Sequence, residues 1–288
     1  MRDYVIYTDS GCDLGLDLLA EWGVKSKNLV FRFDGEEKEY ENGEMEIKAF
    51  YDKMREGGVA KTAAVNKETF AIAFREILDE GKDVLYLGFS SGLSTTYNSG
   101  RLAAIELGEQ YPDAKIITVD TLAASAGQGL LVYLAKKKKD EGATIEQCAA
   151  YIEEIRLNMC HWFTVDDLVY LKRGGRVSST AAFFGNALGI KPVMHVDNEG
   201  HLVNVSKVRG RKSAIVAMAD KYTETAIDKE NGLVFISHAD CQSDADELCR
   251  ILRERHGAKV EIVTSVGPVI GAHSGPGTLA LFFIGTTR

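Results

Sequence analysis

Cysteine, proline and positive charge are all scarce in this chain. Its 288 residues include 5 cysteines and 4 prolines, and 34 basic residues are outnumbered by 42 acidic ones, for a net charge of -8. So little proline argues against a proline-rich linker, and a negative chain lacks the cationic surface that nucleic acids and anionic membranes require. We therefore expect no nucleic-acid partner, while local basic clusters leave room for transient membrane contact.

The number and spacing of the cysteines bear on the redox state of the compartment and on metal binding. Their number is odd, no C-x-x-C pair occurs, and no histidine stands at zinc-binding spacing from them. This usage fits a reducing compartment and gives no reason to expect a metal site. No apolar run reaches the length of a membrane span, and the first residues lack the apolar stretch of a signal peptide. We expect a cytoplasmic protein without an integral membrane segment.

Hydrophobic periodicity predicts alternating strands and helices in the first half. The predicted strands cover 4–7, 28–33, 84–89 and 114–119, and the predicted helices cover 14–22, 46–55, 68–79, 100–109, 130–138 and 145–157. Strands separated by helices favour a largely parallel sheet with helices on both faces. The first half is therefore predicted to be an α/β domain.

The second half has a different order of elements. Two strands at 189–196 and 201–205 are joined by a hairpin turn, Asp197-Asn-Glu-Gly200, and are followed by helices at 214–225 and 244–256 with strands at 233–237, 259–264 and 279–284. This pattern predicts a second α/β or α+β domain. We place the N-terminal domain at 1–160 and the C-terminal domain at 161–288, with a ligand between them.

The loop Gly88–Ser99, GFSSGLSTTYNS, is the most informative segment. It is rich in hydroxyls, lacks charge and lies between a buried strand and a helix. Glycine allows close backbone approach, and hydroxyls with free N–H groups can hold an anion. Gly88–Gly92 also matches G-x-S-x-G, the nucleophile elbow of serine hydrolases, with Ser90 or Ser94 as nucleophile and His273 as base. A binder of phosphorylated small molecules is the other alternative.

Other polar segments allow structural or functional interpretations. Asp13 or Ser10 is expected to cap the helix that follows the first strand, although this loop also suits phosphate or Mg²⁺. His273 lies in a predicted rigid loop of small residues, where backbone can approach a ligand. Two basic clusters suit phosphate or a partner, because guanidinium groups pair well with phosphate and carboxylate. Their arginines are Arg173, Arg176, Arg209 and Arg211.

Taken together, several motifs resemble those of the DegV family over essentially the whole chain. They are Thr8-Asp9-Ser10 with Asp13-Leu14, Ser90-Ser91-Gly92-Leu93-Ser94 with Thr96-Tyr97, Tyr170-Leu171-Lys172-Arg173-Gly174-Gly175-Arg176, Lys191-Pro192, and Gly267-Pro268-Val269-Ile270-Gly271 with His273 and Gly275-Pro276-Gly277.

The resemblance implies a bacterial, two-domain α/β protein that binds one long-chain fatty acid, such as hexadecanoate, between its domains. The implied role is non-catalytic: the chain is an acyl carrier that presents the carboxylate to an ATP-dependent fatty acid kinase, with no cofactor. By motif match, Thr62, Ser94 and His273 hold the carboxylate. The supporting residues are Asp9, Ser10, Ser91, Gly92 and Gly271. Arg173, Arg176, Arg209 and Arg211 are expected to contact the acyl phosphate or the kinase.

Two segments depart from the family pattern. The usual Thr-Ser-Gln-Pro-Ser is Thr62-Ala63-Ala64-Val65-Asn66 here, which removes polar groups from one loop, and the usual glycine after the ligand serine is Thr95. The first change is expected to alter the pocket wall or the preferred acyl chain. The second is expected to stiffen the loop, because threonine cannot adopt positive φ as glycine can.

Overall fold

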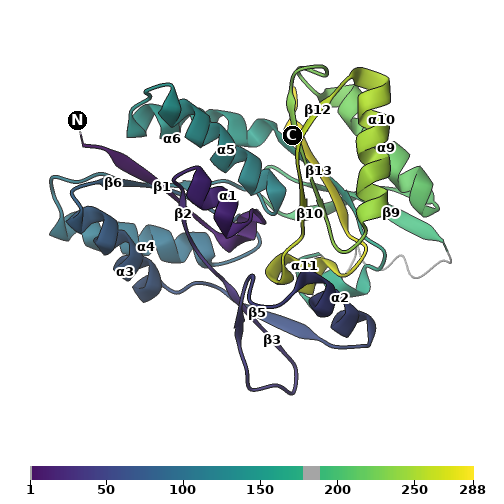
Figure 1. Cartoon of the computed structure of the whole chain (residues 1–288), viewed down its shortest axis with the longest axis horizontal. Helices are drawn as coiled ribbons and strands as arrows, with labels where there is room; N and C mark the ends of the chain where they lie inside the picture. The colour runs from purple at the N-terminus through teal and green to yellow at the C-terminus, as the bar shows by residue number, and fades with distance from the viewer. Residues whose placement is uncertain (1, 178–188) are drawn as a thin grey trace.

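The computed structural model describes residues 2–177 and 189–288, which form three sheets (Figure 1). The first is a four-stranded parallel sheet in the order β2-β1-β6-β7. Its strands are β1 (Tyr4–Asp9), β2 (Lys25–Lys27), β6 (Asp83–Gly88) and β7 (Ile116–Asp120). The helices that accompany this sheet are α1 (Leu16–Glu21), α3 (Lys67–Asp79), α4 (Thr96–Gln110), α5 (Ala126–Asp140) and α6 (Ile145–Ile155).

Strand β1 shows why this sheet is covered on both faces. Tyr4 and Ile6 join the apolar core formed with α5 and α6, whereas Val5 and Tyr7 join the core formed with α3 and α4. Side chains alternate between the faces of a strand, so a run that is apolar at every position must be buried on both faces. Figure 1 shows the two helix pairs on opposite sides of the sheet.

The second sheet has six strands in the order β10-β9-β8-β13-β11-β12. They are β8 (Met159–Thr164), β9 (Ile190–Val196), β10 (Leu202–Arg209), β11 (Leu233–His238), β12 (Lys259–Ser265) and β13 (Leu279–Ile284). Helices α9 (Arg211–Thr225) and α10 (Gln242–His256) cover its outer face. The inner face packs against α5, so the two halves of the chain share one apolar core.

A small antiparallel sheet, β4-β3-β5, lies beside these two. It contains β3 (Val30–Phe33), β4 (Tyr40–Glu41) and β5 (Ala60–Ala63), and it packs with α2 (Ile47–Arg55) and α11 (Pro268–Ser274). The remaining elements are α7 (Val169–Arg173) and the short 3-10 turns η1 (Ser10–Cys12) and η2 (Arg156–Asn158). This sheet brings residues near position 62 against residues near position 273.

The predicted α/β class, with a parallel sheet flanked by helices and a second sheet, is confirmed. The predicted loop around His273 is wrong in part, because Pro268–Ser274 is a helix: Gly267 precedes it, and proline suits a first helical turn. Strand β8 was missed because its run, MCHWFT, follows a helix without glycine or proline between them. The expected domain boundary at 160/161 falls inside β8, and the division stays a prediction.

The helix-capping interpretation of Asp13 and Ser10 is also wrong. Helix α1 begins after Gly15 without a side-chain cap. The Ser10 hydroxyl instead accepts from the Leu29 N–H at 2.9 Å, and Asp13, in a left-handed conformation, accepts from the Gly267 N–H at 2.9 Å. Both side chains therefore connect distant segments.

Across residues 2–177 and 189–288, no helix combines the length and the apolarity needed to cross a bilayer.

Candidate ligand-binding site

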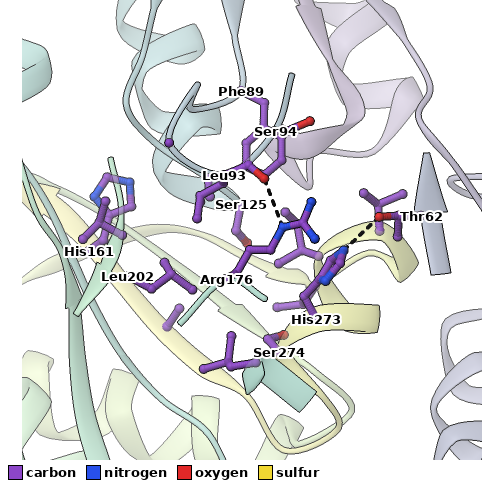
Figure 2. Close-up of a pocket in the computed structure, with 18 of the residues that line it drawn as sticks. Thr62, Phe89, Leu93, Ser94, Ser125, His161, Arg176, Leu202, His273 and Ser274 are labelled. Carbon is purple, nitrogen blue, oxygen red and sulfur yellow. Dashed lines mark hydrogen bonds between the residues drawn. The ribbon is translucent and has the colours of Figure 1, made fainter. Parts of the chain in front are cut away.

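A cavity of about 550 Å³ lies between the loop after β6, the end of β5, helix α11 and the inner face of the six-stranded sheet (Figure 2). This volume lies within the usual range for small-molecule sites. Most of the lining is apolar, and the apolar side chains include Leu29, Phe89, Phe163, Leu171, Val196, Leu202, Val266, Val269, Ile270 and Phe282. The elements that enclose the cavity come from both halves of the chain.

Thr62 and His273 form a hydrogen-bonded pair at one side of the cavity. Strand β5 positions Thr62 and helix α11 positions His273, with 2.8 Å between Thr62 Oγ1 and His273 Nε2. Burial lowers the pKa of His273 to about 4, with a further contribution from the nearby Arg176 charge. At neutral pH the pair therefore presents uncharged polar groups.

Ser94 also lines the cavity, on the turn that leads into α4. The backbone N–H groups of Leu93 and Ser94 both donate to the Ser90 carbonyl, which closes the turn. Ser94 Oγ accepts from the Thr96 N–H at 3.2 Å and lies 2.9 Å from Thr96 Oγ1. The structure thus brings Thr62, Ser94 and His273 to one cavity.

The predicted supporting residues lie around this turn and helix. Asp9 is fully buried and accepts from the N–H of Phe89, the first loop residue, at 2.9 Å. The Ser91 N–H donates to Asp120 at 3.2 Å. Gly92 packs against the hairpin turn of the other half: a Cβ there would lie 2.7 Å from the Glu199 carbonyl oxygen. These contacts fix the loop position.

Gly271 permits a close approach at α11. A Cβ at this position would lie 2.4 Å from Tyr51 Oη, whose hydroxyl donates to the Val266 carbonyl at 2.8 Å. Any larger residue would push α11, and His273 with it, away from α2. The expected role of Gly271 in supporting the site thus has a steric basis.

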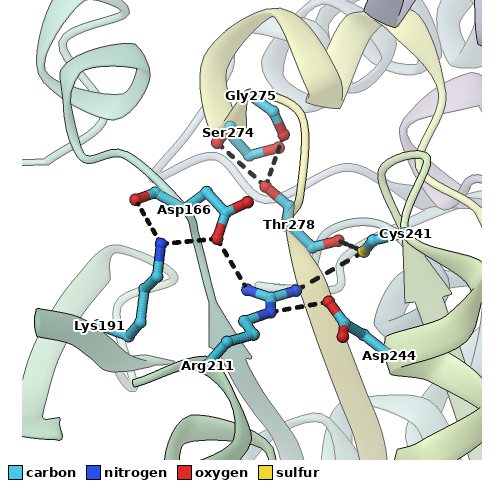
Figure 3. Close-up of polar contacts among 8 residues, drawn as sticks. All are labelled: Asp166, Lys191, Arg211, Cys241, Asp244, Ser274, Gly275 and Thr278. Atoms are coloured by element: carbon cyan, nitrogen blue, oxygen red, sulfur yellow. Dashed lines mark hydrogen bonds and ion pairs between the residues drawn. The ribbon is translucent and has the colours of Figure 1, made fainter. Parts of the chain in front are cut away.

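Of the four predicted arginines, Arg176 lines the cavity, and its Nε donates to the Leu93 carbonyl at 3.1 Å. Arg211 does not line it, and Figure 3 shows its guanidinium between Asp166 and Asp244. Its Nε lies 2.8 Å from Asp244 Oδ2, and its Nη1 lies 3.6 Å from Asp166 Oδ1. Arg173 and Arg209 are exposed.

The geometry around Ser90 gives little support to a hydrolase. Ser90 is fully buried, and its hydroxyl donates to the Gly200 carbonyl at 3.0 Å. The Nε2 of His273 lies against Thr62 instead of a serine. Within the described part of the chain, no group of three or more His, Cys, Asp or Glu side chains is arranged to hold a metal ion.

Five further polar residues line the cavity that the sequence did not single out: Ser125, Ser237, His161, Ser274 and Thr278. Ser125 precedes α5 with a φ of 53° and lies 2.5 Å from Asp13 Oδ2 and 2.9 Å from Ser237 Oγ. A positive φ at a residue other than glycine often marks a functional site. Neither that angle nor which face of a strand would line a cavity could be read from the sequence.

The family model described as "Uncharacterised protein, DegV family" matches residues 3–286. A DegV domain-containing protein of Clostridium perfringens is 43% identical over 289 residues, which cover 100% of this chain and 99% of that protein. Among solved structures, a fatty-acid-binding DegV family protein from Thermus thermophilus has a TM-score of 0.89 and 32% identity, over 99% of this chain and 100% of that one.

A stearic-acid-binding protein from Eubacterium ventriosum has a TM-score of 0.88 and 26% identity, over 98% of both chains. These relatives are described as binding proteins, in agreement with the expectation of a protein without its own catalysis. The whole-chain family match and the identity to the Clostridium protein together establish that the chain belongs to the DegV family.

Proposed function

We propose that this protein binds one long-chain fatty acid in the cavity and presents its carboxylate to a partner fatty acid kinase. The observation that carries the proposal is a cavity of about 550 Å³ with a largely apolar wall and a neutral polar pair, Thr62 and His273, at one side. The fatty acids bound by the Thermus and Eubacterium relatives support the same ligand class.

The apolar wall supplies the driving force for binding. A 16-carbon acid has about 14 methylenes, and burying each stabilises the complex by about 0.8 kcal/mol, or roughly 11 kcal/mol before the costs of association. Phe89, Phe163 and Phe282 provide large apolar surfaces for this contact. A strong ionic anchor for the carboxylate is then unnecessary.

The polar pair positions the carboxylate through hydrogen bonds. If neutral His273 carries its proton on Nε2, it donates to Thr62 Oγ1, which leaves the Thr62 hydroxyl free to donate to the ligand. Ser94 supplies a second hydroxyl from the loop after β6. Neither of these two donors is charged. The cation that lines the cavity, Arg176, is an exposed residue whose guanidinium donates to the Leu93 and Gly174 carbonyls.

We expect replacement of both Thr62 and Ser94 by alanine to weaken palmitate binding roughly thirtyfold, because two hydrogen bonds of about 1 kcal/mol each are lost. Isothermal titration calorimetry on delipidated protein measures the change. The matched control is Ser213→Ala with Thr286→Ala, which also removes one serine and one threonine hydroxyl, but from exposed positions outside the cavity. Unchanged affinity in the Thr62 and Ser94 variant would show that the carboxylate is bound elsewhere.

The kinase step is tested at the exposed arginines. The double variant Arg173→Glu with Arg209→Glu is expected to lower the rate of phosphate transfer to the bound acid at least tenfold. The reason is that it reverses both charges on the surface proposed to contact the kinase or the acyl phosphate. The assay follows acyl phosphate formation with a purified fatty acid kinase. The control Lys229→Glu with Arg253→Glu changes the net charge equally at two other exposed positions. If both double variants support transfer at the normal rate, these arginines have no part in it.

A further inference from the structure

Ser90, the central serine of the G-x-S-x-G match, has no role in the proposed carboxylate site. It is fully buried and does not line the cavity. Its backbone and side chain are nevertheless all hydrogen-bonded within the protein, beginning with its N–H, which donates to the Ala123 carbonyl at 2.9 Å. A buried residue whose polar groups are all satisfied rigidifies the backbone around it. Ser90 is therefore a fixed point in the loop after β6.

The polar groups of Ser90 set the turn that contains Ser94. The Ser90 carbonyl accepts from the Leu93 N–H at 3.0 Å and from the Ser94 N–H at 3.1 Å. Its hydroxyl oxygen accepts from the Gly92 N–H at 3.2 Å. Three successive N–H groups of the turn thus donate to one residue. The place of Ser94 in the cavity wall follows from the place of Ser90.

The Ser90 hydroxyl also joins this turn to the other half of the chain. It donates to the Gly200 carbonyl at 3.0 Å, since a carbonyl can only accept. Gly200 has a φ of 80°, and a Cβ there would lie 2.1 Å from Ser90 Oγ, so the close approach requires glycine. Gly200 belongs to the turn of the β9–β10 hairpin, whose Val196 and Leu202 line the cavity. One buried hydrogen bond therefore connects the Ser94 turn with the apolar wall.

We propose that Ser90 is a positioning residue for the ligand carboxylate: by anchoring the turn to the β9–β10 hairpin, its hydroxyl holds the Ser94 hydroxyl at the place where it meets the carboxylate. This inference rests on the proposed fatty-acid function. Arg176 also reaches the turn, through the Leu93 carbonyl, but from an exposed position where water competes. The buried Ser90 bond is free of that competition. Without it, the turn and the hairpin can separate and Ser94 shifts away from the ligand.

The test uses the acid-to-ester ratio, which is the affinity for palmitate divided by the affinity for its methyl ester, measured by titration calorimetry. A carboxylate accepts hydrogen bonds more strongly than an ester, so the ratio reports on the carboxylate contacts. We expect Ser94→Ala to lower the ratio about fivefold, and Ser90→Ala to lower it about threefold or more. The double variant should match Ser94→Ala, because Ser90 acts through Ser94, whereas independent effects would multiply.

Thr121 provides the matched control. It is equally buried and lies outside the cavity, and its hydroxyl also donates to a carbonyl, that of Gly88, at 2.7 Å, and accepts from the N–H two residues on, that of Ala123, at 3.3 Å. Thr121→Val should leave the ratio unchanged, because the Gly88 carbonyl still accepts from the Thr121 N–H at 3.2 Å. Gly200→Ala disturbs the same anchor from the hairpin side and should lower the ratio as Ser90→Ala does. Circular dichroism establishes that each variant is folded, and Gly200→Ala decides the question if Ser90→Ala does not fold.

Three results would overturn the inference: an unchanged ratio in folded Ser90→Ala or Gly200→Ala, effects of Ser90→Ala and Ser94→Ala that multiply in the double variant, or an equal drop in Thr121→Val. General destabilisation would weaken acid and ester alike and leave the ratio unchanged. Palmitate binding with a ratio that does not respond to Ser90→Ala rejects this inference alone. Failure of the unaltered protein to bind either ligand rejects the proposed function too.

Discussion

Replacing Asp9 by alanine is expected to lower the free energy of unfolding by about 4 kcal/mol, because buried donors lose their acceptor. One carboxylate oxygen accepts from the Tyr86 hydroxyl at 2.8 Å and the Phe89 N–H at 2.9 Å. The other accepts from the Gly11 N–H at 3.0 Å and the Gln128 amide at 3.3 Å. All four donors are buried with Asp9. Alanine leaves the Tyr86 hydroxyl and the N–H groups of Phe89 and Gly11 without this acceptor, whereas the Gln128 amide keeps Thr8 Oγ1 as an acceptor at 3.0 Å.

Urea denaturation at neutral pH measures this loss. Asp113→Ala is the control, since Asp113 is exposed and its replacement should change stability by less than about 0.5 kcal/mol. Because Phe89 opens the loop that carries Ser94, the Asp9 variant should also bind fatty acid more weakly wherever it remains folded. A loss below about 1 kcal/mol would show that the four contacts contribute little.

Replacing Asp13 by asparagine is expected to remove a large part of the pH dependence of the free energy of unfolding. Burial raises the pKa of Asp13 from 3.8 to about 7, against the opposing effect of its hydrogen bonds with Ser125 and Gly267. Between these values the folded protein holds a proton that the unfolded chain has released. Stability is therefore lost as pH rises through this interval, by up to about 1.4 kcal/mol per unit and about 4 kcal/mol in all.

Asparagine can accept from the Gly267 N–H with its oxygen and donate to Ser125 with its amide, and it does not titrate. Asp13→Asn should therefore match the unaltered protein near pH 4 and become increasingly more stable as pH rises toward 7. Chemical denaturation at a series of pH values measures the difference, in which the titration of the buried histidines cancels because it is common to both proteins. A constant difference from pH 4 to 7 would show that Asp13 is ionised throughout.

Asp13, whose ionisation is expected to affect the free energy of unfolding, is also connected to residues that line the cavity. Its carboxyl lies 2.5 Å from Ser125 Oγ, and Ser125 lies 2.9 Å from Ser237 Oγ, so one short chain of polar groups runs from the first half to the sheet of the second. Ser125 and Ser237 both line the cavity. Groups that connect the two halves therefore also line the cavity.

The sequence alone determined the α/β class and the segments that reach the cavity. The run Val84-Leu85-Tyr86-Leu87 predicted a buried strand because it is apolar throughout, and the glycines and hydroxyls after it predicted a turn before the next helix. The family motifs placed Thr62, Ser94 and His273 at one site, and the structure brings these residues to one cavity. A local pattern is enough to predict a strand or a turn, because these elements depend on residues that are neighbours in the chain.

The tertiary structure decided which polar residues line the cavity. His161 and Trp162 are adjacent in one strand, yet only His161 lines the cavity, because side chains alternate and the sheet has one inner face. Arg176 and Arg211 are alike in sequence context, but the second is engaged with Asp166 and Asp244 outside the cavity. Both outcomes depend on contacts between segments far apart in the chain, which no local pattern records.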